Sequence, residues 1–503
     1  MLQNFERENL LRTAVVLTLW LGFVAPAVAE QRFEFAALAI PEDGRIVVPV
    51  IEGDALNGIA AVIDERTAGA LSVAAREAAF TGETGTTLTL LAVAPYSRID
   101  LIGIGAETVS RAAAEDFGGT ASALLGDTES GSVDILWPGE NVDTDATAAR
   151  VAFGYRLRGY RFDEHKAEPF DRDKLPTVVL RSDDGSADEF ANDLVHLADG
   201  VFFSRNMSSE PANHIYPESF VERVREQFRG LDNVEIKVLD ENDIQRLNMG
   251  ALWGVGKGSS RPPRLLIIEY MGGGDQVPVV LAGKGITFDT GGISIKTGEN
   301  MWMMKGDLGG AAVVTGTILA AARRGAPLNV VALAALAENM PSGTATRPGD
   351  VLSSMSGITI EISSTDAEGR LVLSDAVHFG QVTYEPDVLI DVATLTGSVG
   401  RALGDDYAGI FGRHDEIIEQ LSTASDAAGE GVWRLPLDDS HFEQIESKYG
   451  DIVNGGVGSP GASVGAAFIG SFVDEDQVWA HLDIAGVDYL EEDRPTAVSY
   501  THL

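Results

Sequence analysis

The chain has 503 residues, 45% of them hydrophobic and 22% charged, which is long enough for several domains and typical of a globular protein. Its 76 acidic residues against 37 basic ones give a net charge of −39, which repels nucleic-acid phosphates and anionic membranes. We interpret this charge as a solvated acidic surface of the salt-adapted kind; the alternative is a field that attracts cationic substrates. Because there is no cysteine, disulfides and thiolate metal sites are excluded.

Residues 1–29 have the pattern of a signal peptide. Arg7 and Arg12 precede the apolar run 14–24, and Ala27 and Ala29 provide a small-x-small cleavage site. The run is too short to span a bilayer, which takes about 20 apolar residues. We therefore expect an exported protein, periplasmic or secreted, with no membrane span in the mature chain. If the segment is not a leader, the protein is expected to be cytoplasmic.

Residues 30–187 alternate between strand-like and helical stretches, which predicts a smaller N-terminal α/β domain. The predicted strands are 46–51, 87–94, 98–104, 133–136 and 177–181, and the clearest helical stretches are 68–80 and 111–125. Residues 188–210 predict a connecting helix and linker.

Residues 211–503 alternate more regularly and predict a larger α/β domain with a mainly parallel central sheet flanked by helices. The predicted strands are 277–282, 329–336, 358–362 and 388–392, and the predicted helices are 309–324 and 371–380. Ligands of such a sheet gather outside the carboxyl ends of its strands.

Three glycine-rich blocks of charged residues, 283–296, 305–310 and 364–371, follow these strands or begin a helix. We expect them to share one rim of the sheet. Asp366 and Glu368 are one residue apart, so in an extended segment both side chains point the same way. Buried like charges need positive charge between them, and carboxylates without histidine suit Zn²⁺, Mn²⁺ or Mg²⁺. The alternative for each aspartate taken singly is a helix cap or turn residue.

Other catalytic motifs are absent from the sequence. Gly283-Lys284 is not a phosphate-binding loop, because Pro278 stands where its first glycine belongs. The sequence also holds no His-Glu-x-x-His zinc motif and no Gly-x-Ser-x-Gly nucleophile elbow.

The three blocks closely resemble the active site of the leucine aminopeptidase family, the dinuclear metallo-exopeptidases of cytosol-aminopeptidase type. The matching residues are Lys284, Asp289, Lys296, Asp307, Asp366, Glu368 and Arg370. Further matches lie at 249–252, 260–265, 393–397 and 479–486. The resemblance is specific over about 205–490 and looser over 33–185. One departure is Ser364, where the family has an asparagine that is not a metal ligand.

The resemblance implies two divalent metal ions, Mn²⁺ or Zn²⁺, and a bicarbonate ion. One metal would be held by Lys284, Asp289, Asp307 and Glu368, and the other by Asp289, Asp366 and Glu368. Lys296 would stabilise the developing oxyanion. Arg370, together with Leu395, would hold the bicarbonate that relays a proton. The family's apolar substrate pocket is matched by Met304, Thr394, Gly397 and Ala485, while Asp488 stands where some relatives have a hydrophobic residue.

The implied function is a metal-dependent leucyl aminopeptidase that removes leucine and other apolar residues from peptides with a free N-terminus. The resemblance also implies a homohexamer. One alternative is a dipeptidase or cysteinylglycine-type peptidase of the same fold. Another is a DNA-binding regulator acting through the N-terminal domain, which the net charge of −39 opposes. The resemblance fades near 494–497, so we expect the C-terminus to be truncated after about residue 497.

Overall fold

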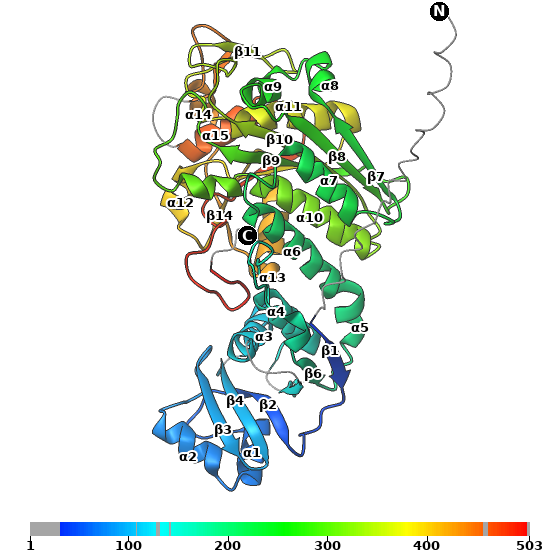
Figure 1. The fold of residues 1–503 in the computed structure, drawn as a ribbon, viewed down its shortest axis with the longest axis vertical. Coiled ribbons are helices and arrows are strands. Elements are labelled where there is room, and N and C mark those ends of the chain that lie inside the picture. The colour runs from blue at the N-terminus through cyan, green and yellow to red at the C-terminus, as the bar shows by residue number, and fades with distance from the viewer. Residues whose placement is uncertain (1–30, 107, 127–130, 140–141, 456–460, 500–503) are drawn as a thin grey trace, which may run out of the picture.

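The computed structural model describes residues 31–106, 108–126, 131–139, 142–455 and 461–499, and the predicted leader at 1–29 lies outside them. The described chain forms two lobes stacked along the long axis of the molecule (Figure 1). The lower lobe holds the N-terminal sheet, and the upper lobe holds a larger sheet with helices on both faces. This is the two-domain α/β architecture that the alternation of elements predicts.

The N-terminal sheet has six strands in the order β1-β6-β5-β2-β4-β3, and only the pair β3–β4 is antiparallel. Its strands are β1 (Phe33–Ala36), β2 (Gly44–Ile51), β3 (Thr87–Val93), β4 (Tyr96–Gly105), β5 (Ser132–Leu136) and β6 (Thr177–Arg181). Its helices are α1 (Gly58–Arg66), α2 (Ala70–Glu77), α3 (Arg111–Leu125) and α4 (Ala148–Arg158). Ile46 and Val48 pack on one face of the sheet with α1 and α2, and Val47 packs on the other with α3 and α4.

A nearly continuous helical segment connects the two lobes. It consists of α5 (Ala187–Glu189), a π-helical turn over Phe190–Leu194, and α6 (Val195–Ser209). Helix α6 packs closely on α10 (Gly309–Arg323), since a Cβ on Gly200 would lie 2.5 Å from the carbonyl oxygen of Gly316. Ser204 Oγ donates a hydrogen bond to the carbonyl of Ala312 at 3.0 Å, which joins the helices further.

The upper lobe is built on eight strands in the order β15-β14-β17-β13-β9-β10-β8-β7. The central strands β17, β13, β9 and β10 are parallel, whereas β8 and β14 pair with them in antiparallel fashion. The strands are β7 (Val234–Leu239), β8 (Arg264–Met271), β9 (Val279–Asp289), β10 (Asn329–Asn339), β13 (Leu389–Ala393), β14 (Ala408–Gly412), β15 (Val432–Arg434) and β17 (Trp479–Asp483). The other helices are α7 (Pro217–Gln227), α8 (Glu241–Arg246), α9 (Gly250–Gly256), α11 (Gly369–Tyr384), α12 (Gly397–Leu403), α13 (Asp415–Ala428), α14 (Asp439–Glu443) and α15 (Gly461–Gly470).

Strand β10 shows why this sheet is covered on both faces. Every residue of it is buried, and the apolar run leaves no polar side to face water. Val331 and Leu333 pack with α9 and α11 on one face, while Ala332 and Ala334 pack with α10 and α7 on the other. The carboxyl ends of the central strands are therefore the part of the sheet left open to a ligand.

Two details of the predicted layout are wrong. Strand β9 runs on to Asp289, so Lys284 lies within a strand and does not follow one. Strand β12 (Thr359–Glu361) belongs to a separate three-stranded sheet with β11 (Val351–Ser353) and β16 (Ile452–Val453). The third charged block therefore reaches the rim from a different sheet, because local strand propensity does not say which strands pair.

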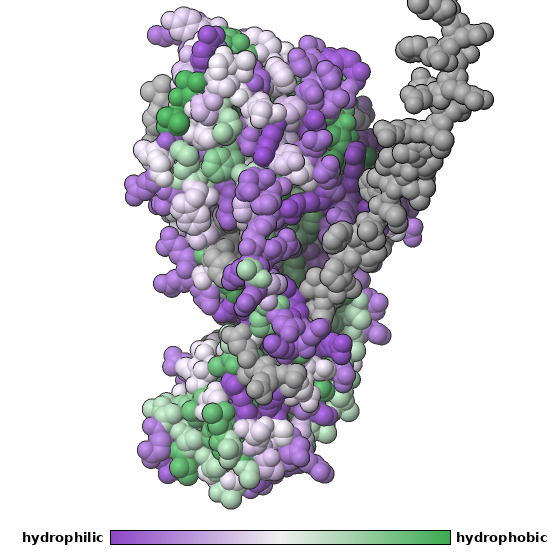
Figure 2. Space-filling model, viewed as in Figure 1, coloured by the Kyte–Doolittle hydropathy of each residue, from purple (hydrophilic) through white to green (hydrophobic). Residues whose placement is uncertain are grey.

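The surface visible in Figure 2 is largely hydrophilic, with apolar residues gathered over the lower lobe around α1 and α2. Val62, Val73 and Leu91 are among the exposed apolar side chains of this lobe. Among the described residues, none of the helices has both the length and the apolar character needed to cross a bilayer.

Candidate metal centre

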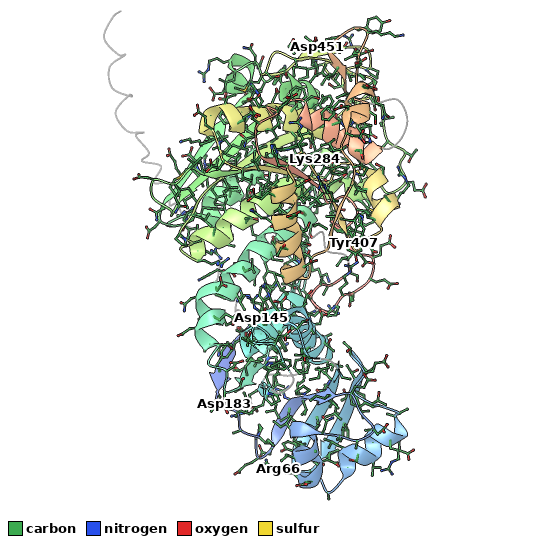
Figure 3. All side chains as sticks on the ribbon, turned by 180° about the vertical axis from the view of Figure 1, so that it is seen from behind. Arg66, Asp145, Asp183, Lys284, Tyr407 and Asp451 are labelled. Carbon is green, nitrogen blue, oxygen red and sulfur yellow. The ribbon has the colours of Figure 1, made fainter. Side chains whose placement is uncertain are left out.

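Strand β9 places Lys284 and Asp289 in the interior of the upper lobe. Both side chains are almost fully buried, with exposed fractions of 2% and 1%. Figure 3 labels Lys284 in the middle of the upper lobe, away from its outline. Because β9 and β10 run parallel, Asp289 pairs with Asn339, and both strands end at the same rim.

The four predicted carboxylates and the two predicted lysines form one charged cluster. Lys284 lies at the centre of one half of it. Its Nζ lies 2.6 Å from Asp307 Oδ1 and 3.1 Å from Glu368 Oε1, and it donates a hydrogen bond to the carbonyl of Thr394 at 2.7 Å. The start of α11 approaches so closely that a Cβ on Gly369 would lie 2.6 Å from two side-chain carbons of Lys284. Glycine at position 369 therefore leaves room for the lysine.

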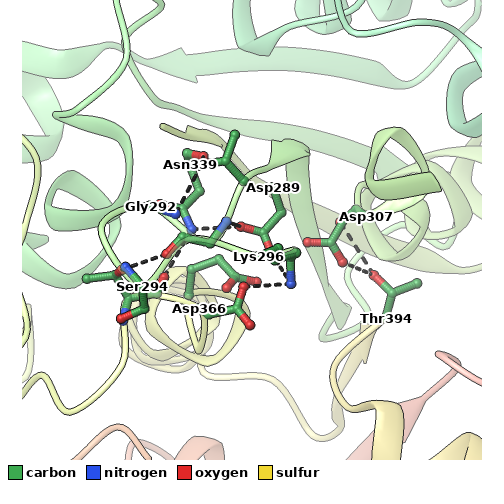
Figure 4. A network of polar contacts seen from close by, with 12 residues as sticks. Asp289, Gly292, Ser294, Lys296, Asp307, Asn339, Asp366 and Thr394 are labelled. Carbon is green, nitrogen blue, oxygen red and sulfur yellow. Dashed lines mark hydrogen bonds and ion pairs between the residues drawn. The ribbon is translucent and has the colours of Figure 1, made fainter. Parts of the chain in front are cut away.

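Lys296 is the centre of the other half. Its Nζ lies 2.8 Å from Asp289 Oδ2 and 2.6 Å from Asp366 Oδ1 (Figure 4). Asp289, Asp366 and Glu368 each offer a carboxylate oxygen within 4.8 Å of the other two. The structure thus brings together all four predicted carboxylates and both predicted lysines.

The convergence of Asp366 and Glu368 has a different cause from the one the sequence suggested. The segment around them is not extended: it is a turn that leads into α11, and Glu368 has helical backbone angles of φ −83° and ψ −34°. The prediction that strand parity aligns the two side chains is therefore wrong. The turn is attached to the loop after β9, since Thr365 Oγ1 donates to the carbonyl of Gly291 at 2.6 Å.

Burial and crowding shift the pKa values of these groups. Burial raises the pKa of Asp307 well above its usual range, although Lys284 opposes the shift. Burial, with the nearby charge of Glu368, raises the pKa of Asp289 to about 6 against the effect of Lys296. Burial alone would lower the pKa of Lys284, but the carboxylates around it outweigh burial and raise that pKa. The carboxylates around Lys284 and Lys296 therefore carry more negative charge than the two lysines balance.

The donor set fits divalent metal ions. Four carboxylates face two lysines and the guanidinium of Arg370, which interacts with Glu368, so one negative charge is uncompensated when all seven groups are ionised. Asp307 Oδ2 and Glu368 Oε2 are buried and have no hydrogen-bond partner among the described residues. Buried polar atoms without partners are rare and costly, and carboxylate oxygens are good ligands for hard and borderline dications.

Two supporting residues were missed by the sequence reasoning. Asn339 Nδ2 donates to Asp289 Oδ1 at 2.7 Å and to the carbonyl of Thr365 at 3.0 Å, which ties β9 to the third block. Asn454, from the loop after β16, bridges to the same block, since its Nδ2 donates to the carbonyl of Ser364 at 2.6 Å. Asn339 could have been found, because it is the polar residue that ends a buried parallel strand.

Arg370 and Leu395 lie on the same side of the cluster. Arg370 Nη1 donates to the carbonyl of Asn454 at 2.9 Å, while its buried Nε has no partner among the described residues. A Cβ on Gly465 would lie 3.0 Å from the Leu395 side chain and 3.6 Å from Arg370 Nη2. The unpartnered Nε is thus a buried guanidinium donor of the kind that a small anion would require.

The predicted pocket residues come from three segments, two of which adjoin Asp307. Met304 lies on the 3₁₀ turn Met301–Gly306 that leads to Asp307, and Thr394 Oγ1 donates to Asp307 Oδ1 at 2.8 Å. Gly397 begins α12, which packs in a small apolar cluster that includes Ala485. Thr394 is therefore also a direct partner of a predicted metal ligand.

A buried carboxylate–lysine cluster with unpartnered oxygens, set at the rim of a parallel sheet, has the donors of a divalent-metal site, which is typical of metal-dependent hydrolases. Comparison with known proteins gives the particular family. The family model described as "Cytosol aminopeptidase family, catalytic domain" matches residues 202–501, and the model of that family's N-terminal domain matches residues 47–169. The chain belongs to the cytosol aminopeptidase family, and it is a metal-dependent aminopeptidase, as its sequence motifs imply.

Relatives and solved structures agree with this assignment. A probable cytosol aminopeptidase of Caulobacter vibrioides is 42% identical over 474 residues, covering 91% of this chain and 93% of that protein. A mutant of tomato leucine aminopeptidase has a similar fold, with a TM-score of 0.84 at 27% identity, covering 93% of this chain and 94% of that one. A bottromycin maturation enzyme in complex with Mn has a TM-score of 0.79 at 29% identity, covering 92% and 96%.

Proposed function

We propose that the cluster holds two divalent metal ions, Mn²⁺ or Zn²⁺. One site would use Lys284, Asp289, Asp307 and Glu368, and the other would use Asp289, Asp366 and Glu368. The observation that carries this proposal is the excess of buried carboxylate with two unpartnered oxygens, on Asp307 and Glu368. Asp289 and Glu368 would contribute to both sites; Glu368 lies beside Lys284 and Asp289 beside Lys296.

When bound, the two dications would supply an acidified water, a polarised scissile carbonyl and an anchor for the free amine of the substrate. The chain's own residues would do the rest. Lys296 lies on the open side of Asp289 and Asp366, with a quarter of its side chain exposed. It would donate to the oxyanion that develops in the transition state, where a positive charge contributes most.

Arg370 would bind bicarbonate through its unpartnered Nε, with Leu395 beside it. When bound there, a bicarbonate ion would supply the base that hydrolysis needs to carry a proton. Arg370 itself cannot act as a base, because its guanidinium stays protonated at any pH in the working range. Its role would be to position this proton carrier.

We propose leucine and other apolar residues as preferred N-terminal side chains, bound among Met304, Thr394, Gly397 and Ala485. The test compares leucine anilide with its N-acetylated form after reconstitution with Mn²⁺ or Zn²⁺. We expect turnover of the free form only, because acetylation removes the amine that anchors the substrate. Chelation should abolish activity, and either metal should restore it. Equal turnover of the acetylated form would overturn the proposed substrate anchor.

We propose that the chain assembles as a homohexamer, as the family resemblance implies. Closed symmetric assembly would restrict the site to short peptides. The net charge of −39 opposes association, so assembly should strengthen as salt screens the charge. Light scattering across a salt series tests this, and a monomer at every ionic strength that still cleaves leucine anilide would contradict it.

We also propose that residues 1–29 direct export, that 30–187 and 211–503 are the two domains, and that 188–210 connects them. N-terminal sequencing of the protein from cell fractions tests the leader. An intact first residue on protein from the cytoplasmic fraction would refute export. It would place the protein where the names of its relatives, cytosol aminopeptidases, put them.

A further inference from the structure

A second group of metal-ligating side chains lies where the N-terminal lobe meets the catalytic lobe. His165 comes from the segment between α4 and β6, and Glu210 and His214 directly follow α6. One ring nitrogen of each histidine and one oxygen of Glu210 lie within 4.8 Å of one another. None of these three side chains has a part in the proposed reaction.

Glu210 is the buried carboxylate of this group. Its side chain is fully buried, its Oε1 lies 2.7 Å from His165 Nε2, and its Oε2 accepts from Arg223 Nη1 at 3.1 Å. Arg223 thus fixes one oxygen and leaves the other directed at the imidazoles. A hydrogen bond to the second oxygen is how proteins commonly orient a metal-binding carboxylate.

The two imidazoles are already held side by side. Their rings stack with centroids 4.4 Å apart at an angle of 27°, and both residues are exposed, so an ion and a water molecule can reach them. The backbone around His214 is fixed, because its N–H donates to the carbonyl of Pro211 at 2.8 Å and its carbonyl accepts from Ser219 Oγ at 3.0 Å. Rotation of the two side chains out of the stack would direct both nitrogens at one ion without moving this backbone.

An ion pair between His165 and Glu210 explains less of this arrangement than a metal site does. His165 alone would satisfy Glu210, and a second protonated imidazole stacked on the first would repel it. Two neutral imidazoles and one carboxylate, with a water as the fourth ligand, are a donor set that Zn²⁺ commonly takes. The positive charge of Arg223 would weaken the affinity, and the nitrogen donors favour Zn²⁺ over Mn²⁺.

We propose that His165, Glu210 and His214 form a separate Zn²⁺ site that ties the segment between α4 and β6 to the catalytic lobe. Because ligands arrive from both lobes, binding would stabilise their contact by mass action.

The test is zinc content after equilibrium dialysis, measured on the wild type, His165→Gln and His214→Gln. We expect each variant to bind one equivalent less than the wild type, whatever the load of the catalytic centre, and to keep its Mn²⁺-supported turnover of leucine anilide. The thermal midpoint should rise with Zn²⁺ more in the wild type than in either variant. Both histidines are exposed, so the folded state should be retained.

His196→Gln is the matched control. His196 Nδ1 lies 3.8 Å from Asp199 Oδ2, but it belongs to no such three-donor group among the described residues. This variant should keep the wild-type zinc content. Unchanged zinc content in both His165→Gln and His214→Gln would overturn the proposal and leave only the ion pair with Glu210. Loss in one variant but not the other would also overturn it, because the site needs both nitrogens.

Discussion

The two lobes differ in how their buried carboxylates are balanced. In the N-terminal sheet, Asp100 faces Arg98 at 2.7 Å and Asp134 faces Arg181 at 2.5 Å, so each acid has an arginine of its own. In the catalytic lobe, Asp307 and Glu368 share the single amine of Lys284, and each keeps a buried oxygen without a partner among the described residues.

This difference distinguishes buried carboxylates that stabilise the fold from buried carboxylates that bind a ligand. An unpaired buried charge costs several kcal/mol, so an excess is tolerated where a bound ion completes the balance. Matched pairs in the N-terminal sheet need no ligand, whereas the cluster on β9 does. Counting charges within one buried group is therefore a guide to where this protein performs its chemistry.

The largest expected effect comes from removing a bridging carboxylate. Asp289→Ala or Glu368→Ala should lower turnover of leucine anilide by more than about 10⁴-fold, beyond what loss of acid–base catalysis alone would give. Metal content should fall at the same time. Asp134→Ala, the control from the matched pair, should lose stability but keep its metal and its kcat. If Asp289→Ala kept a full metal complement, the excess of charge would have another explanation.

Arg370→Ala should have the next largest effect. Because Arg370 positions a proton carrier and binds no metal, we expect a loss of about 10²–10⁴-fold in kcat with metal content unchanged. Arg370→Lys should recover part of this loss. The role assigned to Arg370 is wrong if its alanine variant is as inactive as Glu368→Ala while both metals remain bound.

Alanine substitutions at two tightly packed glycines distinguish packing at the metal centre from packing in the N-terminal lobe. A Cβ on Gly369 would lie 2.6 Å from carbons of Lys284, so Gly369→Ala should displace the lysine and lower kcat by up to about 10²-fold. A Cβ on Gly154 would lie 1.8 Å from the carbonyl oxygen of Glu115, so Gly154→Ala should separate α4 from α3. That variant should lose about 1–3 kcal/mol of stability and keep its kcat. Denaturant titration and steady-state kinetics on both variants distinguish the outcomes.

The smallest expected effect concerns Asp375, a buried carboxylate held by N–H groups and not by a cation. It accepts from the amides of Ala251, Leu252 and Met355 at 3.0, 2.9 and 2.8 Å. Burial nevertheless raises its pKa to about 7, above the unfolded value, so its contribution to stability is complete at low pH and is lost as the pH rises through 7.

Asp375→Asn cannot ionise and should lack this pH dependence. Relative to the wild type, its free energy of unfolding should therefore rise by about 2 kcal/mol between pH 5.5 and 8. Both proteins carry the same metal centre, so the titration of its groups cancels in the comparison. A difference that is constant across this pH range would show that Asp375 keeps one protonation state in the folded protein.

The sequence by itself determined the chemistry of the site and the alternation of elements. Lys284, Asp289 and Glu368 could be named from their motifs, and α3 and β6 have the predicted bounds, because burial and helix or strand periodicity are local signals. The same local signals say nothing about which strands pair or which segments converge.

Only the tertiary structure decided how the cluster is assembled. It extended β9 to Asp289, put β12 in a separate sheet, and carried Asp366 to the rim on a turn instead of a strand. It also brought His165 to Glu210, 45 residues along the chain. These contacts are made between segments distant in sequence, and their free energy comes from packing and charge balance that no local pattern records.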